Sequence, residues 1–518
     1  MRSISPVGLP LPTAGEMSEI DARTQSEYSI PELVLMENAG QRIWERAKRW
    51  AGPRLCDDAL LVIVAGTGNN GGDALVIARA AWLEDRYAVA VVLTRRPESG
   101  PAAVHAASCE ALGIPLINYA EAPEDAHALI GEADWLFDGL LGTGLSGEVR
   151  GAVARLIEEI NTCSATVIAI DVPSGVGDGF RRGYAAVHAS LTLTVELPKQ
   201  ALYLPYARPF CGEIEAVSIG FPPQLLHRLE SGVVALSDRD REALLPPPVA
   251  AAHKGARGVL AVFAGAPETG GALLLAAGAA SRGPCGYVTA YIDAELYNAV
   301  SGRYPSLVIR TLAAAGVLET PLSPPADALL CGPGWGSASN RDELLAKLLE
   351  SGLPGVLDAD GLRVLARLRA DDNAPELGGR WVLTPHPGEA ALLTGHRAGE
   401  LLERPVETVR ELAETYDSVV VLKAHVTYVA DPADECVYVI DGMNPALGTA
   451  GSGDVLAGVI AGLLAHGLSP SRAACLGVLI HQHAGAGAAR ELGWYDAEQV
   501  LSYLGRSAVA GQWNGGDE

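Results

Sequence analysis

Glycine-rich segments in the first half of the chain carry Asn, Asp and Ser side chains where a ligand could be held. Residues 65–73 read Ala-Gly-Thr-Gly-Asn-Asn-Gly-Gly-Asp and directly follow an apolar run. Glycines let backbone amides approach a phosphate, and a helix that starts there adds the positive end of its dipole. The spacing is neither that of the dinucleotide fingerprint nor that of a P-loop. A tight turn without a ligand is the alternative, but such a turn has no use for two Asn side chains and an Asp.

Two further segments place polar side chains after later apolar runs. Asp138 precedes the glycine-rich stretch 139–147, and Asp171 and Ser174 lie in the stretch Ile-Asp-Val-Pro-Ser-Gly at 170–175. If the apolar runs are parallel strands, their carboxyl ends meet at one edge of a sheet, where α/β sheets bind ligands. Asn, Asp and Ser oxygens are hard ligands that suit an alkali or alkaline-earth cation. We therefore expect one cleft that binds a ligand and offers oxygen atoms to a cation.

A glycine-rich segment near the end of the chain has the composition of a phosphoryl-transfer site. Gly451, Ser452 and Gly453 open an apolar helix, and Asp454 stands in its first turn. Free amides at a helix start stabilise the charge that develops on phosphoryl oxygens, and a neighbouring carboxylate takes the proton of the attacking hydroxyl. The alternative is an acidic residue that only stabilises the helix dipole. We expect Asp454 to be a catalytic base.

Histidine and lysine residues of the second half give weaker signals. His386 stands between two prolines after an apolar run, which favours a ligand role, and Lys423 ends another run, where its ammonium could meet a nucleotide phosphate. A solvated Lys423 is the alternative. His481 and His483 look like a metal pair, but side chains two positions apart on a helix point to different faces. We expect these two rings to be packed or exposed.

Strands and helices must position these segments, and the apolar runs predict how. Short β-branched runs alternate with helical patterns, which is typical of βαβ units and of a parallel sheet covered on both faces. We therefore predict an α/β protein with a three-layer αβα arrangement in each half. The predicted strands are 60–66, 88–94, 114–119, 135–140, 166–172 and 191–197 in the first half, and 259–265, 287–292, 306–311, 328–331, 355–358, 381–384, 418–422 and 436–441 in the second. The predicted helices include 74–84, 149–161, 454–464 and 472–490, and an amphipathic region spans 16–50.

A pause in this alternation predicts two domains. The stretch 244–258 contains three consecutive prolines, which exclude a helix and favour an extended linker. A second series of strands and helices starts at residue 259. We expect an N-terminal domain at residues 1–228 and a C-terminal domain at residues 229–518.

Composition limits the class of protein and its partners. The 518 residues include 38 Lys and Arg against 62 Asp and Glu, a net charge of −24, which disfavours binding to nucleic acid or to an anionic membrane. Eight cysteines without a Cys-x-x-Cys pair are typical of a reduced, cytoplasmic protein. The first residues lack the apolar core of a secretory signal, and the most apolar stretch is too short and too glycine-rich to span a bilayer. We expect a cytoplasmic protein with neither kind of partner.

The motifs of the first half resemble those of the NAD(P)H-hydrate epimerase domain, over roughly residues 12–222. They are LMENAG at 35–40, GTGNNGGD at 66–73, DGLLGTGLSG at 138–147, AIDVPSGV at 169–176 and LPKQALYLP at 197–205. The resemblance implies a Rossmann-like domain with Asp171 as a catalytic residue beside the reacting ring, and a potassium ion on Asn70, Asp138 and Ser174. The substrate-binding residues that it implies are Asn69, Asn70, Gly71, Gly72, Asp73, Gly142, Thr143, Gly144, Leu145, Ser146, Gly147, Glu148 and Asp171.

The motifs of the second half resemble those of the ADP- or ATP-dependent NAD(P)H-hydrate dehydratase, over roughly residues 233–510. They are HKGARG at 253–258, CGPGWG at 331–336, LDADGL at 357–362, LTPHPGE at 383–389 and GTAGSGD at 448–454. The resemblance implies a ribokinase-like αβα fold and Mg²⁺ with ADP or ATP. It places Ala272, Gly334, His386 and Asp454 on the hydrate, with Asp454 as the base. The nucleotide-binding residues that it implies are Lys423, Ala424, His425, Val426, Thr427, Gly451, Ser452 and Gly453. The stretch 422–427 departs from the family pattern at Ala424 and His425.

Together the two motif sets predict a bifunctional enzyme that repairs nicotinamide nucleotides. It would interconvert the R and S forms of NAD(P)H hydrate and dehydrate the S form to NAD(P)H at the expense of ADP or ATP. One alternative is that only one domain is active and the other is a degenerate binding module. Another is that the C-terminal half is a small-molecule kinase, although TPHPGE at 384–389 is closer to the dehydratase pattern. We expect hydrate and nucleotide as small-molecule ligands, and a homo-oligomer.

Overall fold

The described part of the chain forms two compact units. The computed structural model describes residues 8–145, 147–247, 253–312, 322–338, 340–371 and 374–508. The first unit runs from Pro10 to Ser231, and the second contains the described residues from Gly232 onward together with Gly8 and Leu9. The sequence predicted a boundary between residues 228 and 229 and assigned every earlier residue to the first domain. The start of the chain differs from this expectation, because Gly8 packs against Val234 and Leu236 of the second unit.

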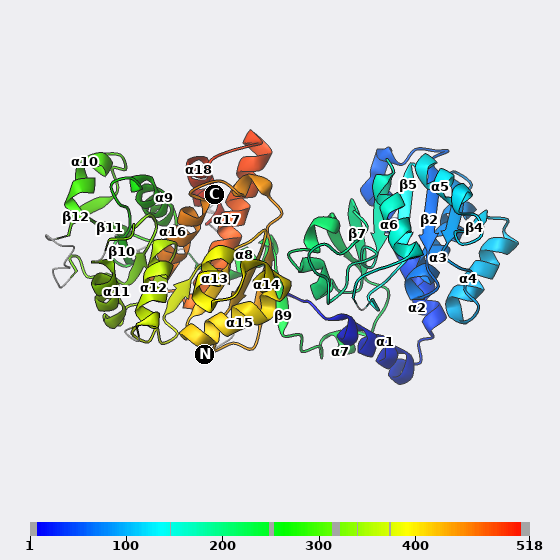
Figure 1. Cartoon of the computed structure of the whole chain (residues 1–518), viewed down its shortest axis with the longest axis horizontal. Coiled ribbons are helices and arrows are strands. Elements are labelled where there is room, and N and C mark those ends of the chain that lie inside the picture. The colour runs from blue at the N-terminus through cyan, green and yellow to red at the C-terminus, as the bar shows by residue number, and fades with distance from the viewer. Residues whose placement is uncertain are drawn as a thin grey trace, which may run out of the picture. The chain divides into compact units, whose positions relative to one another are not determined.

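The N-terminal unit is built on a parallel sheet (Figure 1). Its described strands have the order β4-β3-β2-β5-β6-β7-β8, and every neighbouring pair is parallel. The chain starts at β2, adds β3 and β4 on one side, and then crosses to β5 on the other, so the strand order reverses between β2 and β5. The bounds are β2 Leu60–Ala65, β3 Ala88–Leu93, β4 Leu116–Asn118, β5 Trp135–Gly139, β6 Thr166–Ile170, β7 Leu191–Val195 and β8 Glu213–Val217.

Helices cover both faces of this sheet and enclose an apolar core on each side. The amphipathic region 16–50 is two helices, because Ser29 adopts a left-handed conformation (φ 56°) and Pro31 follows it. Helix α1 starts with a capping box, in which the side chains of Thr13 and Glu16 each accept a hydrogen bond from the other residue's backbone amide. The bounds are α1 Ala14–Tyr28, α2 Glu32–Ala51, α3 Asn69–Leu83, α4 Gly100–Ala111, α5 Pro123–Glu132, α6 Ala152–Thr162 and α7 Pro223–Leu226.

The C-terminal unit contains a larger sheet. Its described strands have the order β1-β9-β18-β17-β16-β15-β14-β13-β10-β11-β12, in which β17 is antiparallel to both β16 and β18. The strands from β16 to β12 are parallel throughout. The bounds are β1 Leu9–Pro10, β9 Val233–Leu236, β10 Val259–Phe263, β11 Tyr287–Ile292, β12 Val308–Thr311, β13 Ala328–Cys331, β14 Gly355–Leu357, β15 Trp381–Leu383, β16 Val419–Leu422, β17 Val426–Ala430 and β18 Val437–Asp441.

The most apolar helices of the C-terminal unit pack together on one face of this sheet. Helices α9, α16, α17 and α18 contact one another and share one buried apolar cluster with the sheet. Helices α11 to α15 lie in front of the sheet in Figure 1. The bounds are α8 Asp238–Leu244, α9 Gly270–Ser281, α10 Tyr297–Val300, α11 Arg341–Glu350, α12 Asp360–Ala370, α13 Pro387–Thr394, α14 Ala398–Glu403, α15 Pro405–Tyr416, α16 Ser452–Ala465, α17 Pro470–Leu492 and α18 Ala497–Ser507.

The predicted α/β fold class is confirmed in both units, with differences at individual elements. Strands β1, β8, β9 and β17 were not predicted, and helix α3 begins five residues before the predicted start at Ala74. The helix can begin early because the glycines of the Asn-Asn-Gly-Gly-Asp stretch adopt helical geometry in its first turn. Strand β17 was taken for part of a nucleotide loop, yet its β-branched residues are all buried in the sheet.

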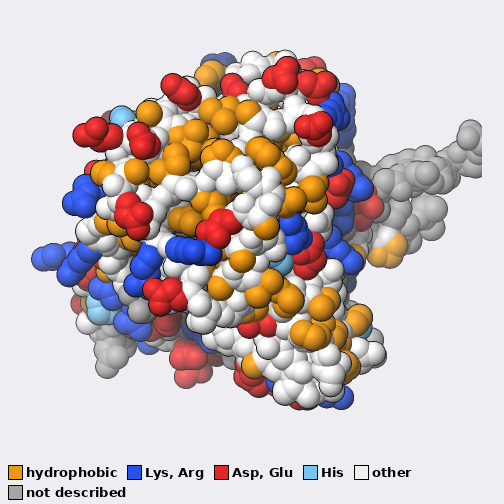
Figure 2. Space-filling view, turned by 90° about the vertical axis from the view of Figure 1, so that its right-hand side faces the viewer, with side chains coloured by type: hydrophobic (Ala, Val, Ile, Leu, Met, Phe, Trp, Pro, Cys, Tyr) orange, Lys and Arg blue, Asp and Glu red, His pale blue; other side chains and the backbone are white. Residues whose placement is uncertain are grey.

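The surface shows no gathering of one charge on the face drawn in Figure 2. Acidic, basic and apolar side chains are interspersed there, although the whole chain is strongly acidic. Among the described residues, no helix combines the length and the apolar character needed to cross a bilayer.

Candidate functional site

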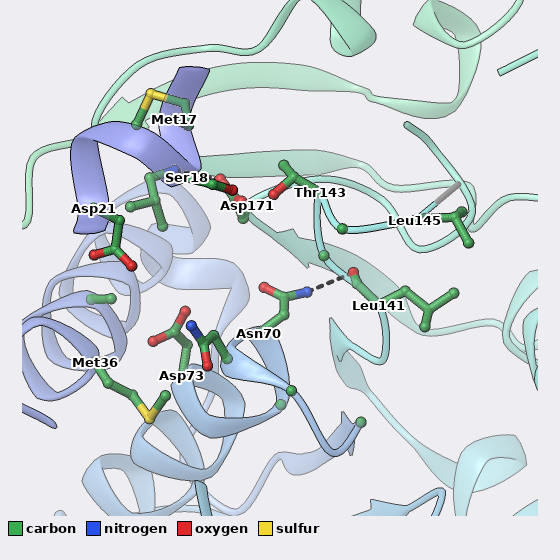
Figure 3. Close-up of a pocket in the computed structure, with 18 of the residues that line it drawn as sticks. Met17, Ser18, Asp21, Met36, Asn70, Asp73, Leu141, Thr143, Leu145 and Asp171 are labelled. Carbon is green, nitrogen blue, oxygen red and sulfur yellow. Dashed lines mark hydrogen bonds between the residues drawn. The ribbon is translucent and has the colours of Figure 1, made fainter. Parts of the chain in front are cut away.

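A cavity of about 770 Å³ lies in the N-terminal unit at the carboxyl ends of β2 and β5 (Figure 3). The strand order reverses between these two strands, so the loops that follow them diverge and leave a crevice. The first turn of α3 forms one wall, the stretch 140–145 forms another, and α1 contributes Met17, Ser18 and Asp21. The volume lies within the range of small-molecule sites, about 300–1,000 Å³.

Most of the predicted substrate residues of this unit line the cavity. They are Asn69, Asn70, Gly71, Asp73, Gly142, Thr143, Gly144, Leu145 and Asp171. Gly72 instead packs closely against α2, so that a Cβ at this position would collide with the Met36 side chain. Gly147 and Glu148 are not among the lining residues, and Glu148 binds the guanidinium of Arg150. Ser146 lies outside the described residues.

Glycine is needed where the two loops cross. A Cβ on Gly71 would collide with the carbonyl oxygen of Gly66, and a Cβ on Gly66 would collide with that of Leu140. The close approach puts the start of α3 directly against the stretch that follows β5. Unsatisfied amides at a helix start favour an anionic group.

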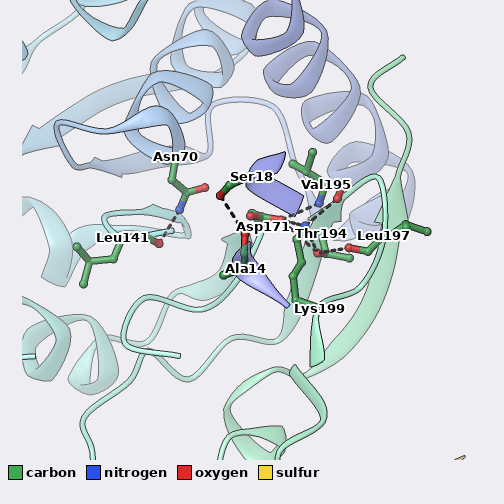
Figure 4. A network of polar contacts seen from close by, with 9 residues as sticks. All are labelled: Ala14, Ser18, Asn70, Leu141, Asp171, Thr194, Val195, Leu197 and Lys199. Carbon is green, nitrogen blue, oxygen red and sulfur yellow. Dashed lines mark hydrogen bonds and ion pairs between the residues drawn. The ribbon is translucent and has the colours of Figure 1, made fainter. Parts of the chain in front are cut away.

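Asp171 and Lys199 form a buried ion pair on the cavity wall (Figure 4). Lys199 is only 2% exposed, and its Nζ donates to Asp171 Oδ1, to Thr194 Oγ1 (3.1 Å) and to the Val195 carbonyl (2.7 Å). Asp171 Oδ1 also accepts from the Val195 amide at 2.9 Å. Among the described residues nothing donates to Asp171 Oδ2, so this oxygen remains for a ligand.

Asp73 lines the same cavity in a different electrostatic environment. Burial, together with the negative charges of Asp171 and Asp21, raises the pKa of Asp73 well above its usual range, and Lys199 opposes this shift only in part. This shift favours the neutral form of Asp73, whereas Asp171 has a cationic partner. Two carboxyl groups whose environments differ in this way suit the roles of an acid and a base.

The three residues predicted to share a cation lie along one chain of hydrogen bonds beside the cavity. Ser174 donates to the Asp138 carboxylate from its amide (2.7 Å) and its hydroxyl (2.5 Å). The Leu141 amide donates to Ser174 Oγ (2.8 Å), and Asn70 Nδ2 donates to the Leu141 carbonyl (2.8 Å). Asn70 Oδ1 is buried and has no hydrogen-bond partner among the described residues.

The oxygen atoms of this chain fit a cation. Asp138 is completely buried, and no described Lys, Arg or His forms an ion pair with it. Burial raises the pKa of Asp138 to about 6, although hydrogen bonds from Ser174 and Leu140 act in the opposite direction. A buried carboxylate is costly without a positive partner. Asn70 Nδ2 donates to the Leu141 carbonyl. If the amide group were flipped, two acceptor oxygens would face each other, so the unpartnered atom of Asn70 is its oxygen.

In the C-terminal unit, the carboxyl ends of β14, β15 and β16 bring Asp358, Thr384 and Lys423 together. Lys423 Nζ lies 2.5 Å from Asp358 Oδ1, and Thr384 Oγ1 donates to the same oxygen at 2.7 Å. Burial acts to lower the pKa of Lys423, but the carboxylates of Asp358 and Glu389 raise it above its ordinary value. Lys423 is therefore a fixed ammonium rather than a solvated surface lysine.

The first turn of α16 lies beside this ammonium. Gly451 adopts φ of 87°, which turns the chain into the helix. A Cβ built on Gly453 would lie 3.4 Å from Lys423 Nζ. Among the described residues, the amides of Gly453 and Asp454 have no backbone acceptor. Free amides and an ammonium at one point form a site for phosphate oxygens.

Asp454 completes this arrangement. Burial and the negative charge of Asp358 raise the pKa of Asp454 to about 7, and Lys423 opposes the rise. A carboxyl group with a pKa near neutrality is suited to take up a proton during a reaction at physiological pH. The alternative of an ordinary helix-dipole carboxylate, exposed to solvent, does not account for this environment.

Two of the three other residues predicted to contact the hydrate are direct neighbours. Gly334 adopts φ of 55°, and a Cβ there would lie 2.8 Å from the Ala272 Cβ at the start of α9. Thr269 Oγ1 donates to the Gly334 carbonyl at 2.6 Å and fixes the contact. The backbone of this turn therefore approaches α9 as closely as glycine allows.

His386 has a structural role in addition to any ligand role. Its Nδ1 accepts from the amides of Gly388 (3.0 Å) and Glu389 (3.3 Å), so the ring caps helix α13. Its side chain is 54% exposed, and Nε2 lies 3.3 Å from Glu389 Oε1. The prolines on either side hold the ring at the strand end, as predicted, and leave Nε2 accessible.

The stretch predicted to hold the nucleotide is divided between a turn and a strand. Lys423 and Ala424 are half-buried and His425 is exposed, whereas Val426 and Thr427 are buried in β17. The His425 carbonyl accepts from the Gly442 amide at 2.8 Å, which fixes the turn. The side chain of Val426 is part of the core, so a nucleotide could reach that residue only at its backbone.

His481 and His483 have separate partners, as their helical spacing predicts. The His481 Nε2 lies 3.1 Å from Ser452 Oγ, and His483 Nδ1 lies 2.8 Å from Asp238 Oδ1. Among the described residues, no group of three or more His, Cys, Asp or Glu side chains could hold a metal ion.

The sequence analysis missed two residues that the structure places in the two sites, Lys199 and Asp358. Lys199 lies in the quoted LPKQALYLP stretch, but its partnership with Asp171 depends on the adjacency of β6 and β7. Asp358 directly follows β14, just as Asp171 follows β6, and this shared position was the available signal. His481 carried no signal that could have linked it to Ser452.

Comparisons with known proteins decide the family. A family model described as YjeF-related protein N-terminus matches residues 32–201, and one described as NAD(P)H-hydrate dehydratase matches residues 260–506. The bifunctional NAD(P)H-hydrate repair enzyme Nnr of Coxiella burnetii is 37% identical, over 91% of this chain and 93% of the relative. The chain belongs to the bifunctional NAD(P)H-hydrate repair enzymes. The predicted family and its enzymatic function are thereby confirmed.

Other relatives of this repair family agree. The enzyme of the same name from Moorella thermoacetica is 35% identical, over 93% of both chains. Among solved structures, the ADP/ATP-dependent NAD(P)H-hydrate dehydratase of Bacillus subtilis, co-crystallised with ATP and Mg²⁺, matches with a TM-score of 0.47 and 27% identity. That match covers 52% of this chain and 96% of the other.

Proposed function

We propose that the N-terminal unit epimerises NAD(P)H hydrates in its 770 Å³ cavity and that the C-terminal unit dehydrates the S form with ADP or ATP. The proposal rests on two sites at strand ends. In the first, Asp73 and Asp171 line a cavity. In the second, Asp454 lies beside Lys423 and the free amides at the start of α16. The first site suits proton transfer on a bound ring, and the second suits phosphoryl transfer to a hydroxyl.

In the N-terminal unit, Asp73 and Asp171 are the reacting carboxyl groups. A carbon that carries a hydroxyl is inverted when that hydroxyl leaves as water and a water returns on the other face. Asp73, whose raised pKa favours its neutral form, donates the proton that the leaving hydroxyl needs. The Asp171 carboxylate, held by Lys199, stabilises the positive charge left on the ring and then takes a proton from the returning water. The residues of the stretches 69–71 and 142–145, which line the cavity, hold the rest of the nucleotide.

A potassium ion fits beside this cavity on Asn70 Oδ1, the Asp138 carboxylate and Ser174 Oγ. Bound there, the ion would neutralise Asp138 and hold together the loops that follow β2, β5 and β6. The orphaned oxygen of Asn70 and the uncompensated charge of Asp138 support this assignment. The ion would act on substrate binding by fixing those loops.

Replacing Asp138 with Ala should impair epimerisation and leave dehydration of pure S hydrate unchanged. Loss of the charged ligand should raise the potassium concentration needed for half-maximal epimerisation by about 10–100-fold, since even outer partners of a metal contribute this much. Potassium should raise the melting temperature of the parent and not that of Asp138→Ala. Asp125→Ala, an exposed acid on α5, is the control. Equal potassium dependence of parent and Asp138→Ala would contradict the site.

In the C-terminal unit, Asp454 takes the proton of the hydrate's hydroxyl while that oxygen attacks the terminal phosphate. The Lys423 ammonium and the amides of Gly453 and Asp454 stabilise the charge on the phosphoryl oxygens. Ala272, Gly334 and His386 hold the hydrate, and the stretch 423–427 holds the nucleotide. The nucleotide leaves as AMP or ADP, and elimination of inorganic phosphate together with a proton from the neighbouring ring carbon then restores NAD(P)H.

Magnesium would enter this site with the nucleotide. The described carboxylates do not form a cage of their own for a metal, so Mg²⁺ would be shared between phosphate oxygens and few protein atoms, as is usual for this ion. Bound in this way, it would neutralise phosphate charge. Asp358, next to Lys423, is a carboxylate within reach of that region.

Dehydration should become faster as the pH rises through about 7. Asp454 acts as a base only when ionised, and its pKa is raised to about 7. Below that pH, kcat/KM should increase about tenfold per pH unit, and above it the profile should be level. Lys423→Gln should move the midpoint to higher pH, because Lys423 lowers the pKa of Asp454. Profiles of S-hydrate dehydration test this, and a profile without a slope between about pH 5.5 and 8 would contradict it.

One experiment tests the proposed function as a whole. The chain is incubated with mixed hydrate epimers, with and without ADP or ATP, and the absorbance of the regenerated reduced cofactor is followed. Complete conversion of both epimers with nucleotide is the expected result. Conversion of the S form alone would indicate a binding module in the N-terminal half, and phosphorylation of a sugar or pyrimidine without dehydration would indicate a kinase. The predicted homo-oligomer and cytoplasmic location stay predictions.

A further inference from the structure

A buried histidine contacts the first residue of α16, the helix that begins at the proposed phosphate site of the C-terminal unit. His481 lies on α17, and its Nε2 is 3.1 Å from the hydroxyl oxygen of Ser452, the first residue of α16. Both side chains are buried, with His481 7% and Ser452 6% exposed. A polar pair in the apolar contact between two helices is costly unless its groups satisfy each other. The contact therefore restrains the Ser452 side chain.

The contact with His481 determines which group the Ser452 hydroxyl can donate to. A serine hydroxyl in a helix commonly donates to a backbone carbonyl of the preceding turn. Here the Ser452 amide donates to the Thr449 carbonyl at 3.3 Å, and His481 Nε2 lies against the hydroxyl. If Nε2 carries the proton of the neutral ring and donates it to Oγ, the Ser452 hydrogen is free to point to another acceptor.

The surroundings of His481 favour the neutral ring that this proton arrangement requires. Burial and the positive charge of Lys423 lower the pKa of His481 to about 4, so the ring is neutral at physiological pH. A neutral imidazole has one N–H, and the tautomer is set by the groups that its nitrogens meet. Ser452 directly precedes Gly453, whose amide is free and whose Cα faces Lys423 Nζ. The Ser452 hydroxyl is thus one residue from the point where the phosphate is expected.

We propose that His481 is a positioning residue for nucleotide binding: it donates to Ser452 Oγ and thereby presents the Ser452 hydroxyl to a phosphate oxygen of ADP or ATP. This inference rests on the proposed nucleotide dependence of the C-terminal unit. Packing alone is the competing account of His481. The two accounts differ in what happens when Ser452 is already absent, since packing does not depend on the Ser452 hydroxyl.

The test measures Mg·ADP and Mg·ATP affinity by titration calorimetry on the full chain. His481→Leu keeps the volume but removes the donor, and Ser452→Ala removes the hydroxyl. Each should weaken nucleotide binding about tenfold, the loss expected for one hydrogen bond to a charged group. In the Ser452→Ala background, His481→Leu should cause no further weakening. His481→Gln, which keeps a donor, should bind within about threefold of the parent.

Matched controls separate this role from folding. His483→Ala alters the same helix two residues away and should leave nucleotide affinity unchanged, since His483 contacts Asp238 instead. Melting temperatures show whether each variant is folded, and if His481→Leu does not fold, Ser452→Ala and His481→Gln still decide the matter. Additive losses in the double variant, or normal affinity in Ser452→Ala, would overturn the proposal. A parent that binds nucleotide without dehydrating the hydrate would refute the proposed function and leave this test valid; a parent that binds no nucleotide would refute both.

Discussion

Replacing Asp454 with Asn should reduce the kcat of dehydration by about 10²–10⁴-fold, the usual contribution of a general base. Asn keeps the shape of the side chain at the start of α16 but cannot accept a proton. The loss should appear in kcat and not in the KM for nucleotide, because the amides of α16 and the Lys423 ammonium remain. Removal of a negative charge beside the phosphate could even tighten nucleotide binding. Single-turnover and steady-state rates with pure S hydrate measure the effect.

The control for this substitution is Glu411→Gln, an exposed acid on α15 of the same unit. Its dehydration rate should equal that of the parent. Epimerisation by Asp454→Asn should also equal that of the parent, because the residue belongs to the other unit. A dehydration rate within about threefold of the parent at saturating nucleotide would show that Asp454 only stabilises the helix. The pH profile of Asp454→Asn should in addition lose its slope below pH 7.

Replacing Lys199 with Met should abolish most epimerase activity and destabilise the N-terminal unit. Met fills a similar volume but leaves Asp171 without its cationic partner in a cavity that also contains Asp73 and Asp21. Breaking a buried ion pair by removing one partner typically costs about 3–5 kcal/mol of unfolding free energy. Asp171 would adopt a new orientation or take up a proton, and we expect kcat/KM for epimerisation to fall by at least about 100-fold. Calorimetry on the full chain measures the change in stability.

A double substitution separates the two effects of Lys199. In Lys199→Met with Asp171→Asn, both charges are gone, so most of the lost stability should return while epimerisation stays absent. Dehydration of S hydrate should be normal in every one of these variants, which controls for damage to the whole chain. Equal stability of Lys199→Met and the parent would show that the ion pair contributes nothing to the unit. Near-normal epimerisation by Lys199→Met would show that the ion pair between Lys199 and Asp171 is not needed for the reaction.

Residues that follow predicted strands were the part of the sites that sequence reasoning could locate. Asp171 and Lys423 each come directly after a β-branched run, and Asp138 lies at the end of the apolar strand β5; parallel strands place their carboxyl ends at one edge. The glycine loops at 66–73 and 451–453 were visible for the same reason, because close backbone approach demands glycine. Such signals are local in the sequence and need no knowledge of strand order.

Partnerships between distant segments could not be predicted in this way. Lys199 meets Asp171 because β6 and β7 are neighbours, and Asp358 meets Lys423 because β14, β15 and β16 lie in that order. The periodicity of apolar residues does not specify strand order. Gly72, a glycine of the ligand motif, also meets a packing requirement against Met36 that the sequence did not reveal. His481 is packed, as expected, but its contact with Ser452 on another helix could not be predicted.

The edge of the larger sheet has a consequence for separating the two activities genetically. Strand β1, which ends in Pro10, covers β9 at this edge, yet it comes from the stretch of chain that precedes the whole N-terminal unit. A dehydratase gene that started at Gly232 would lack this strand, and β9 would become an open edge able to pair with other molecules. Pro10 limits further pairing at the edge formed by β1, because proline has no backbone N–H to donate to another strand. A product of gene fission that kept β9 paired with its own β1 would therefore combine two non-adjacent pieces of coding sequence.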